Sequence, residues 1–485
     1  MTPIQTTDQL SSAAAFVAHE VERFPAEVRA LPVAPDVAPA EIRAYLTERF
    51  SFADPKPLDA ILADVAAMMR RWTLHATHPR YFGLFNPDVH EAGVWGDALA
   101  ALYNPQVGGW WHAPAACEIE RYTLHFFARA MRWDVDAMTA HFTSGGSEAN
   151  HTAVLAAIAL HHGDSLRDGL TKSGARPALY VSRESHHSFH KIARMSGLGD
   201  DAVRVVGVDS RWRIDLAALS AQIAADRAAG WQPMMLVGTA GTTAGGAIDP
   251  LPELAALARR EGLWFHVDAA WGGSALVSPS LGVHLRGIEL ADSVTWDAHK
   301  WLSVPLGAGM FFCKHREPLR QMFDVDTGYV PAGVEGEDDL YRVSIQWSRR
   351  HIGLKVFCTI AALGADGLCR MIEHQAAMGD VLRAKLTERG WIVVNDSVLP
   401  LVCFTHPRID DGSCSAGDLA RRVCSAGRVW ISEVRLTGKA PALRACITSY
   451  RSSEADVDAL AEELQRAITP AAIAAPARSS RSPTP

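Results

Sequence analysis

The chain has 485 residues, of which 48% are hydrophobic and 21% are charged, so it is long enough for one large domain and one or two smaller pieces. Its net charge is −7, and its Lys and Arg residues are spread along the chain, which argues against a nucleic-acid partner. No apolar run reaches the roughly 20 residues of a membrane-spanning helix, so no membrane association is expected.

The first segment, residues 1–75, is predicted to be helical. Its N-terminal stretch is amphipathic and lacks the basic and apolar regions of a secretory signal. Pro-rich links at residues 31–39 and 54–57 separate the helical stretches. Because such links end helices, the sequence indicates several short helices before the main domain.

Residues 76–365 are expected to form the large domain. Short apolar runs rich in β-branched residues alternate with helical stretches such as residues 252–260. This alternation is typical of βαβ units, so the sequence predicts an α/β fold with a mainly parallel sheet. The runs that we interpret as strands cover residues 178–181, 234–237, 263–267 and 309–312.

Residues 366–468 are predicted to form a smaller α+β domain. A helix follows Gly367, strands are expected near residues 391–394 and 401–404, and a last helix spans residues 453–467. The tail at residues 469–485 is rich in Pro, Ala and Ser, a composition typical of disorder.

The eight cysteines are scattered along the chain. They form no CxxC pair, and no close Cys and His set has the spacing of zinc ligands, so no metal is expected. Unpaired thiols of this kind fit a reducing compartment, and we therefore expect a cytoplasmic protein.

The first chemical motif is the segment 263–273, an apolar strand that ends in Asp268 and small residues. Ligands of a parallel sheet bind at the carboxyl ends of its strands. A carboxylate buried there needs a cation or a strong donor, and a protonated pyridine nitrogen is one such partner. The alternative is a strand-end aspartate that only caps the next turn.

About thirty residues later, Lys300 follows a hydroxyl-rich strand and lies among apolar and aromatic neighbours. A lysine in such surroundings loses its charge more readily, and the neutral amine is the form that condenses with an aldehyde. The dipeptide His299-Lys300 is too common to predict a site by itself. Combined with the Asp268 motif about thirty residues earlier, it becomes a strong signal.

Two further motifs precede these. Residues 143–150 combine glycines, hydroxyls and the start of a helix, which can hold an anion. An ordinary capped helix is the alternative. The other motif is a strand at residues 180–182 that leads to His186, which can stack on a planar ring or can simply lie on the surface.

With these four motifs in this order, the chain resembles the group II PLP-dependent amino-acid decarboxylases. This family includes aromatic-L-amino-acid, glutamate, cysteine-sulfinate and diaminobutyrate decarboxylases. The similarity runs from about residue 78 to residue 448, nearly the whole folded chain. It implies a fold-type I enzyme with a seven-stranded sheet, and pyridoxal 5'-phosphate (PLP) as the cofactor.

The resemblance also implies roles for individual residues. Lys300 matches the lysine that forms the Schiff base, Asp268 the partner of the pyridine nitrogen, and His186 the histidine stacked on the cofactor ring. Asp297 matches a phosphate-site position where aromatic decarboxylases often have Asn, so its carboxylate is expected to act through a neighbour or a water. The remaining expected cofactor contacts are Gly146, Ser147, Thr243, Ala270 and His299.

For catalysis, the family implies a proton donor on a loop after the lysine, and Tyr329 matches it in spacing and flanking residues. A phenylalanine there marks relatives that form aldehydes, so the tyrosine favours plain decarboxylation to an amine and CO2. An exposed tyrosine without a role is the alternative. The family further implies a homodimer in which both subunits complete each active site.

The substrate is expected to be an aromatic or bulky apolar amino acid. Phe85, Trp110 and Trp111 suit a planar side chain, and Leu84 lies in the same expected pocket. However, residues 266–273 and 239–243 are similar to the glutamate and cysteine-sulfinate branch. An acidic substrate would need a cation, for which Arg80 is the nearest candidate unless it forms a structural ion pair.

Three other interpretations stay open at this point. The chain can catalyse another reaction of the same fold, such as transamination or lyase chemistry. It can bind PLP without catalysis. It can also be an α/β protein without PLP, in which these motifs are only turns and caps.

Overall fold

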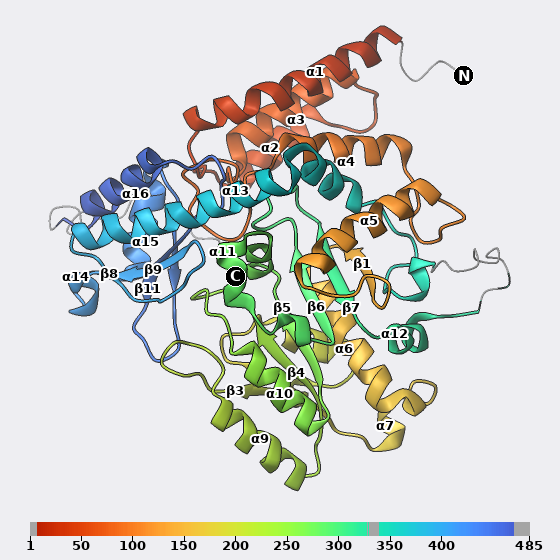
Figure 1. Ribbon diagram of the computed structural model, residues 1–485. Helices are drawn as coiled ribbons and strands as arrows, with labels where there is room; N and C mark the ends of the chain where they lie inside the picture. The colour runs from red at the N-terminus through yellow and green to blue at the C-terminus, as the bar shows by residue number, and fades with distance from the viewer. Residues whose placement is uncertain (1–6, 327, 329–338, 470–485) are drawn as a thin grey trace.

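A computed structural model describes residues 7–326, 328 and 339–469. Its centre is a seven-stranded sheet in the order β1-β7-β6-β5-β4-β2-β3 (Figure 1). The strands are β1 (Thr139–Thr143), β2 (Pro177–Ser182), β3 (Val203–Val206), β4 (Gln232–Thr239), β5 (Trp264–Asp268), β6 (Ser293–Asp297) and β7 (Gly309–Cys313).

The sheet is mainly parallel, which confirms the prediction. Strands β6, β5, β4, β2 and β3 pair in parallel. Strand β7 is antiparallel to both β1 and β6, so the predicted strand at residues 309–312 is the exception. Because β1 and β6 both oppose β7, they run in the same direction. The carboxyl ends of all strands except β7 therefore lie along one edge of the sheet.

Both faces of this sheet are covered by helices, as a parallel sheet requires. Alternate residues of strand β7 belong to different hydrophobic clusters. Phe311 belongs to the cluster that contains residues of α6 and α8, and Met310 and Phe312 belong to the cluster that contains residues of α5 and α10. The helices of this region are α5 (Pro114–Ala130), α6 (Gly146–His162), α7 (Leu170–Ser173), α8 (Ser188–Met195), α9 (Leu216–Ala228), α10 (Leu251–Glu261), α11 (Pro279–Gly282) and α12 (Arg316–Phe323).

The N-terminal part is helical, as its sequence predicts. It contains α1 (Thr7–Glu27), α2 (Pro39–Arg49) and α3 (Leu58–Trp72), which lie together at the top of Figure 1, followed by α4 (Glu91–Tyr103). Arg70 of α3 pairs with two carboxylates of α1, Glu20 at 2.8 Å and Glu27 at 2.7 Å. These ion pairs hold α1 and α3 side by side.

The C-terminal part forms a second, antiparallel sheet in the order β10-β11-β9-β8, packed under α13 and α16. Its elements are α13 (Gly353–Glu388), β8 (Ile392–Val393), β9 (Leu401–Thr405), α14 (Pro407–Asp410), α15 (Ala416–Ser425), β10 (Ser432–Val434), β11 (Ala442–Cys446) and α16 (Glu454–Ala467).

The helix predicted after Gly367 is the second half of α13. This helix begins fourteen residues earlier and is kinked at Gly364, where φ is 66° and ψ is 170°. The kink lies just before residue 366, where we place the start of the small domain. The domain limits themselves stay a prediction.

Two global features concern the chain's environment. Within the described residues, no helix is both long enough and apolar enough to cross a bilayer. All eight cysteines carry free thiols, and five of them are buried.

Candidate active site

The carboxyl ends of the strands meet at a cavity of about 380 Å³, a size typical of small-molecule sites. Strands β5 and β6 end in Asp268 and Asp297, and the segment after β6 carries Lys300. The cavity brings together ten of the residues singled out in the sequence: Phe85, Gly146, Ser147, His186, Thr243, Asp268, Ala270, Asp297, His299 and Lys300.

Lys300 and Asp297 form an ion pair inside this cavity, with Nζ 3.1 Å from Oδ2. His299 lies 3.7 Å from the same oxygen. Burial lowers the pKa of His299, which favours a neutral ring whose Nδ1 accepts the Ala308 amide. The negative charge of the Asp297 carboxylate is therefore balanced by the positive charge of Lys300.

Asp268 is buried at the end of β5, and both of its oxygens accept hydrogen bonds. Oδ2 accepts from Asn150 Nδ2 at 2.8 Å, and Oδ1 accepts from the Ala270 amide at 3.1 Å. Donated hydrogen bonds stabilise the ionised form of a carboxyl group. The cavity thus has an oriented negative charge on the wall formed by β5.

His186 enters the cavity from the turn that follows β2. Its Nδ1 accepts the Ser188 amide at 3.2 Å, so the ring is held by its own turn. Surrounding protein atoms lower the pKa of His186 although its ring is open to the cavity. A neutral planar ring at this position suits contact with a flat ligand.

The start of α6 forms a close-fitting corner of the cavity. A Cβ added at Gly146 would lie 2.8 Å from Asp297 Oδ2 and 3.2 Å from Ala270 Cβ, so only glycine fits there. Gly145 precedes the helix, and no side chain caps it. The first amides of a helix have no intrahelical acceptor, so those of Gly146 and Ser147 are available to an anion.

These features fit PLP. The cofactor needs an amine for its aldehyde, an acidic partner for its ring nitrogen, a flat surface and an anion site for its phosphate. The cavity offers Lys300, Asp268, His186 and the start of α6 for these four needs. In addition, Asp297 Oδ1 is buried without a hydrogen-bond partner among the described residues.

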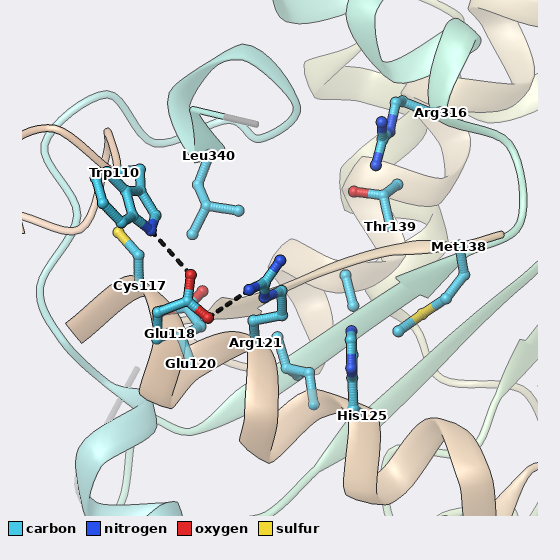
Figure 2. Close-up of a pocket in the computed structure, with 12 residues that line it drawn as sticks. Trp110, Cys117, Glu118, Glu120, Arg121, His125, Met138, Thr139, Arg316 and Leu340 are labelled. Atoms are coloured by element: carbon cyan, nitrogen blue, oxygen red, sulfur yellow. Dashed lines mark hydrogen bonds and ion pairs between the residues drawn. The ribbon is translucent and has the colours of Figure 1, made fainter. Parts of the chain in front are cut away.

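The expected substrate pocket is brought together only in part. Phe85 lies in the cavity, stacked on Trp271 with ring centroids 4.5 Å apart. Leu84 is half exposed and does not line it. Trp110 lines a different cavity, where its Nε1 donates to Glu118 at 2.9 Å (Figure 2). Trp111 lies at the surface. Within one chain, the two tryptophans are thus separate from Lys300.

Of the two other expected residues, the structure describes Arg80 but not Tyr329. Tyr329 lies outside the described residues, so its role stays a prediction. Arg80 Nε donates to Asp456 Oδ1 at 3.0 Å, and Asp456 is almost fully buried. Arg80 is therefore a structural ion-pair partner, which was the alternative that its sequence position left open.

The sequence analysis assigned no role to the cavity residues Asn150 and Trp271, or to Arg444, which contacts the cavity residue Phe85. Asn150 lies one helical turn after Gly146, a spacing that could have placed it at the same cavity. Trp271 directly follows the Asp268 segment. Arg444 is a charged residue inside the apolar strand β11: its guanidinium lies 4.8 Å above the Phe85 ring, and its Nη2 is buried without a partner among the described residues.

Comparison with known proteins agrees with this geometry. The model of the pyridoxal-dependent decarboxylase conserved domain matches residues 39–406. Tryptophan decarboxylase 2 of Oryza sativa subsp. japonica is 28% identical, with 89% of each chain covered. The aromatic-L-amino-acid decarboxylase of Bacillus atrophaeus is 28% identical, with 90% of this chain and 92% of that protein covered.

Solved structures show the same relationship. The crystal structure of mouse CSAD has a TM-score of 0.87 and 27% sequence identity, and the match covers 96% of this chain and 99% of that one. The similarity therefore includes the N-terminal helices and the small C-terminal sheet as well as the cavity. The chain belongs to the pyridoxal-dependent decarboxylases, enzymes that use PLP to remove CO2 from an amino acid.

Proposed function

We propose that the enzyme converts an aromatic or bulky apolar L-amino acid into the corresponding amine and CO2 in the cytoplasm. The observation that carries the proposal is an aromatic wall beside Lys300. Phe85 stacks on Trp271 at 4.5 Å, Trp271 stacks on Trp301 at 5.6 Å, and Lys300 Nζ lies 5.7 Å from the Phe85 ring. Such a wall favours a planar side chain. The relatives named for tryptophan and aromatic amino acids support the same class.

Bound PLP supplies an electron sink for the electron pair released at Cα. In our proposal Lys300 holds the cofactor, and Asp268 keeps its ring nitrogen protonated. His186 covers one side of its ring, with Thr243 and Ala270 nearby. Gly146 and Ser147 bind its phosphate through the amides of α6, while Asp297 and His299 act on the lysine and the phosphate site.

The substrate carboxylate needs a cation, and Arg444 is suitably placed. Its Nε donates to the Thr243 carbonyl at 3.2 Å and its Nη1 to the Gly83 carbonyl at 2.8 Å, which leaves Nη2 for a ligand.

The alternative function is decarboxylation of an acidic or diamino acid. The buried guanidinium of Arg444 beside Phe85 is the feature that favours an acidic amino acid as the substrate.

We further propose Tyr329 as the acid that delivers a proton to Cα after CO2 has left. A homodimer would complete the site, as in the family that the chain belongs to. Helix α4 supports a partner subunit, because Trp95, Leu99, Leu102 and Tyr103 are exposed and recur at the spacing of one helix face. A second subunit would cover this face.

The substrate is tested by measuring CO2 and amine release from a panel of amino acids with the PLP-loaded enzyme. The panel contains Trp, Tyr, Phe, Glu, Asp, cysteine sulfinate and 2,4-diaminobutyrate. We expect kcat/KM to be at least about 100-fold higher for one aromatic substrate than for Glu, since a buried apolar wall penalises a second carboxylate. Preferential turnover of Glu, Asp or cysteine sulfinate would establish the alternative.

The residue roles are tested by two substitutions. Lys300→Ala is expected to abolish the visible absorbance of the lysine-bound cofactor, and to reduce kcat by about 1,000-fold or more because the attachment point is lost. Tyr329→Phe is expected to retain that absorbance and to lose or divert the amine product, detected by chromatography of amine and aldehyde. Amine formation by Tyr329→Phe at the wild-type rate would contradict the assignment of the acid.

A further inference from the structure

A continuous row of buried hydrogen bonds runs along β5, from Trp264 at its amino end to Asp268 at its carboxyl end. Trp264 Nε1 donates to Ser293 Oγ at 2.8 Å, and Ser293 Oγ lies 2.8 Å from His266 Nδ1. His266 Nε2 lies 3.0 Å from Asn150 Oδ1, and Asn150 Nδ2 donates to Asp268 Oδ2 at 2.8 Å. All five residues are at most 5% exposed.

The direction of every bond in this row follows from the chemistry of its two ends. An indole N–H can only donate, so Ser293 Oγ accepts from Trp264 and keeps its own proton available to donate to His266 Nδ1. An ionised carboxylate can only accept, so Asn150 turns its amide nitrogen to Asp268 and its oxygen to His266.

His266 has to satisfy both neighbours with a single proton. Burial lowers the pKa of His266 to about 4, so the ring is neutral near pH 7. Its proton must then lie on Nε2, where Asn150 Oδ1 accepts it and Thr295 Oγ1, at 3.4 Å, is a more distant second neighbour. The tautomer of His266 and the orientation of the Asn150 amide are thus fixed together.

We propose that Trp264, Ser293, His266 and Asn150 form a positioning relay that holds the Asp268 carboxylate in one rotamer toward the cofactor ring nitrogen. With Oδ2 held by Asn150 and Oδ1 by the Ala270 amide, the carboxylate cannot turn away from the cavity. Trp264, Ser293 and His266 do not line the cavity and act through Asn150 and Asp268, whereas Asn150 itself lines the cavity. The proposal rests on the proposed role of Asp268, and it extends that role to three residues of β5 and β6 and one residue of α6.

The test compares two replacements of His266. Gln keeps an N–H donor near the position of Nε2, whereas Leu has no donor and leaves Asn150 free to turn its amide. We expect His266→Leu to weaken PLP binding to the apoenzyme at least about tenfold, the usual effect of removing an orienting hydrogen bond behind an active-site group. It should also shift the visible band of the bound cofactor and lower kcat with KM within about twofold. His266→Gln should stay within about threefold of wild type in all three measurements.

Two further variants make the result decisive. Asn150→Leu removes the direct contact with Asp268 and should reproduce the His266→Leu phenotype, and it replaces that variant if far-ultraviolet circular dichroism shows His266→Leu to be unfolded. Equal PLP affinity and band position in wild type and in the folded leucine variant would overturn the relay, as would equal losses in His266→Gln and His266→Leu. Asp268→Ala serves as the reference variant. If Asp268→Ala leaves the PLP affinity and the visible band unchanged, the proposed role of Asp268 itself is wrong. If Asp268→Ala changes them but the leucine variants do not, only the relay is rejected.

Discussion

At the scale of single residues, the site depends on side chains that are small or absent as much as on charged ones. Gly146 lets Asp297 and Ala270 approach the first turn of α6, and this approach shapes the corner that we assign to the phosphate. The Lys300–Asp297 pair lies next to this corner. A methyl group added at Gly146 is therefore expected to weaken cofactor binding without contacting the amine of Lys300.

This predicts a selective effect of Gly146→Ala. The new methyl group would lie 2.8 Å from Asp297 Oδ2, so we expect PLP affinity to fall by about tenfold or more, with roughly 1–3 kcal/mol lost to overpacking. Gly207→Ala is the matched control, because a Cβ at Gly207 meets nothing within 4 Å. Titration of both apoenzymes with PLP, followed by absorbance, measures the difference. Equal affinities would show that this corner does not bind the cofactor.

At the scale of elements, α13 connects the two sheets through one unusual backbone position. The helix packs against both the large hydrophobic cluster and the C-terminal cluster, and it changes direction at Gly364. The conformation with φ 66° and ψ 170° belongs to a region that only glycine occupies without strain. The sequence shows a glycine here, but not that it bends a helix.

Gly364→Ala is therefore expected to destabilise the protein by roughly 1–3 kcal/mol through backbone strain. A Cβ at Gly364 meets nothing within 4 Å, so steric contact adds nothing to this cost. Urea unfolding of the apoenzyme, followed by circular dichroism, gives the free energy of unfolding. An unchanged midpoint would mean that the kink straightens without cost.

At the scale of the whole molecule, the exposed apolar face of α4 is the surface that the proposed second subunit would cover. Leu102 and Tyr103 are 74% and 77% exposed, unusual values for adjacent large apolar side chains. Trp110 and Trp111 follow this helix in the chain. A partner bound here is the arrangement that would let the two tryptophans contribute to a site other than the one in their own chain.

Leu102→Glu is expected to dissociate the homodimer, because a charge in the centre of an apolar interface loses its hydration without a partner. Sedimentation velocity should show a weakening of dimerisation of about 100-fold or more and a parallel loss of decarboxylase activity. Met195→Glu, at a 58% exposed apolar residue of α8, should remain dimeric. A wild-type protein that sediments as a monomer would reject the proposed homodimer.

The sequence by itself determined the parallel α/β sheet, the helical N-terminal segment and ten of the residues that line the cavity. The sheet and the helical segment follow from local periodicity, and Asp268 from its position at a strand end. Asp297, Thr243, Ala270 and His299 follow from the resemblance to the PLP-dependent decarboxylases. The sequence could not give the antiparallel direction of β7, because burial on both faces gives the same apolar pattern in either direction.

Only the tertiary structure decided which residues meet across the chain. It paired Arg80 with Asp456 and placed Arg444 over Phe85, contacts that join residues 376 and more than 350 positions apart. It also separated Trp110 and Trp111 from Lys300 within one chain, and it aligned Trp264, Ser293, His266 and Asn150 behind Asp268. Such contacts depend on how strands and helices pack, which no local pattern of residue types specifies.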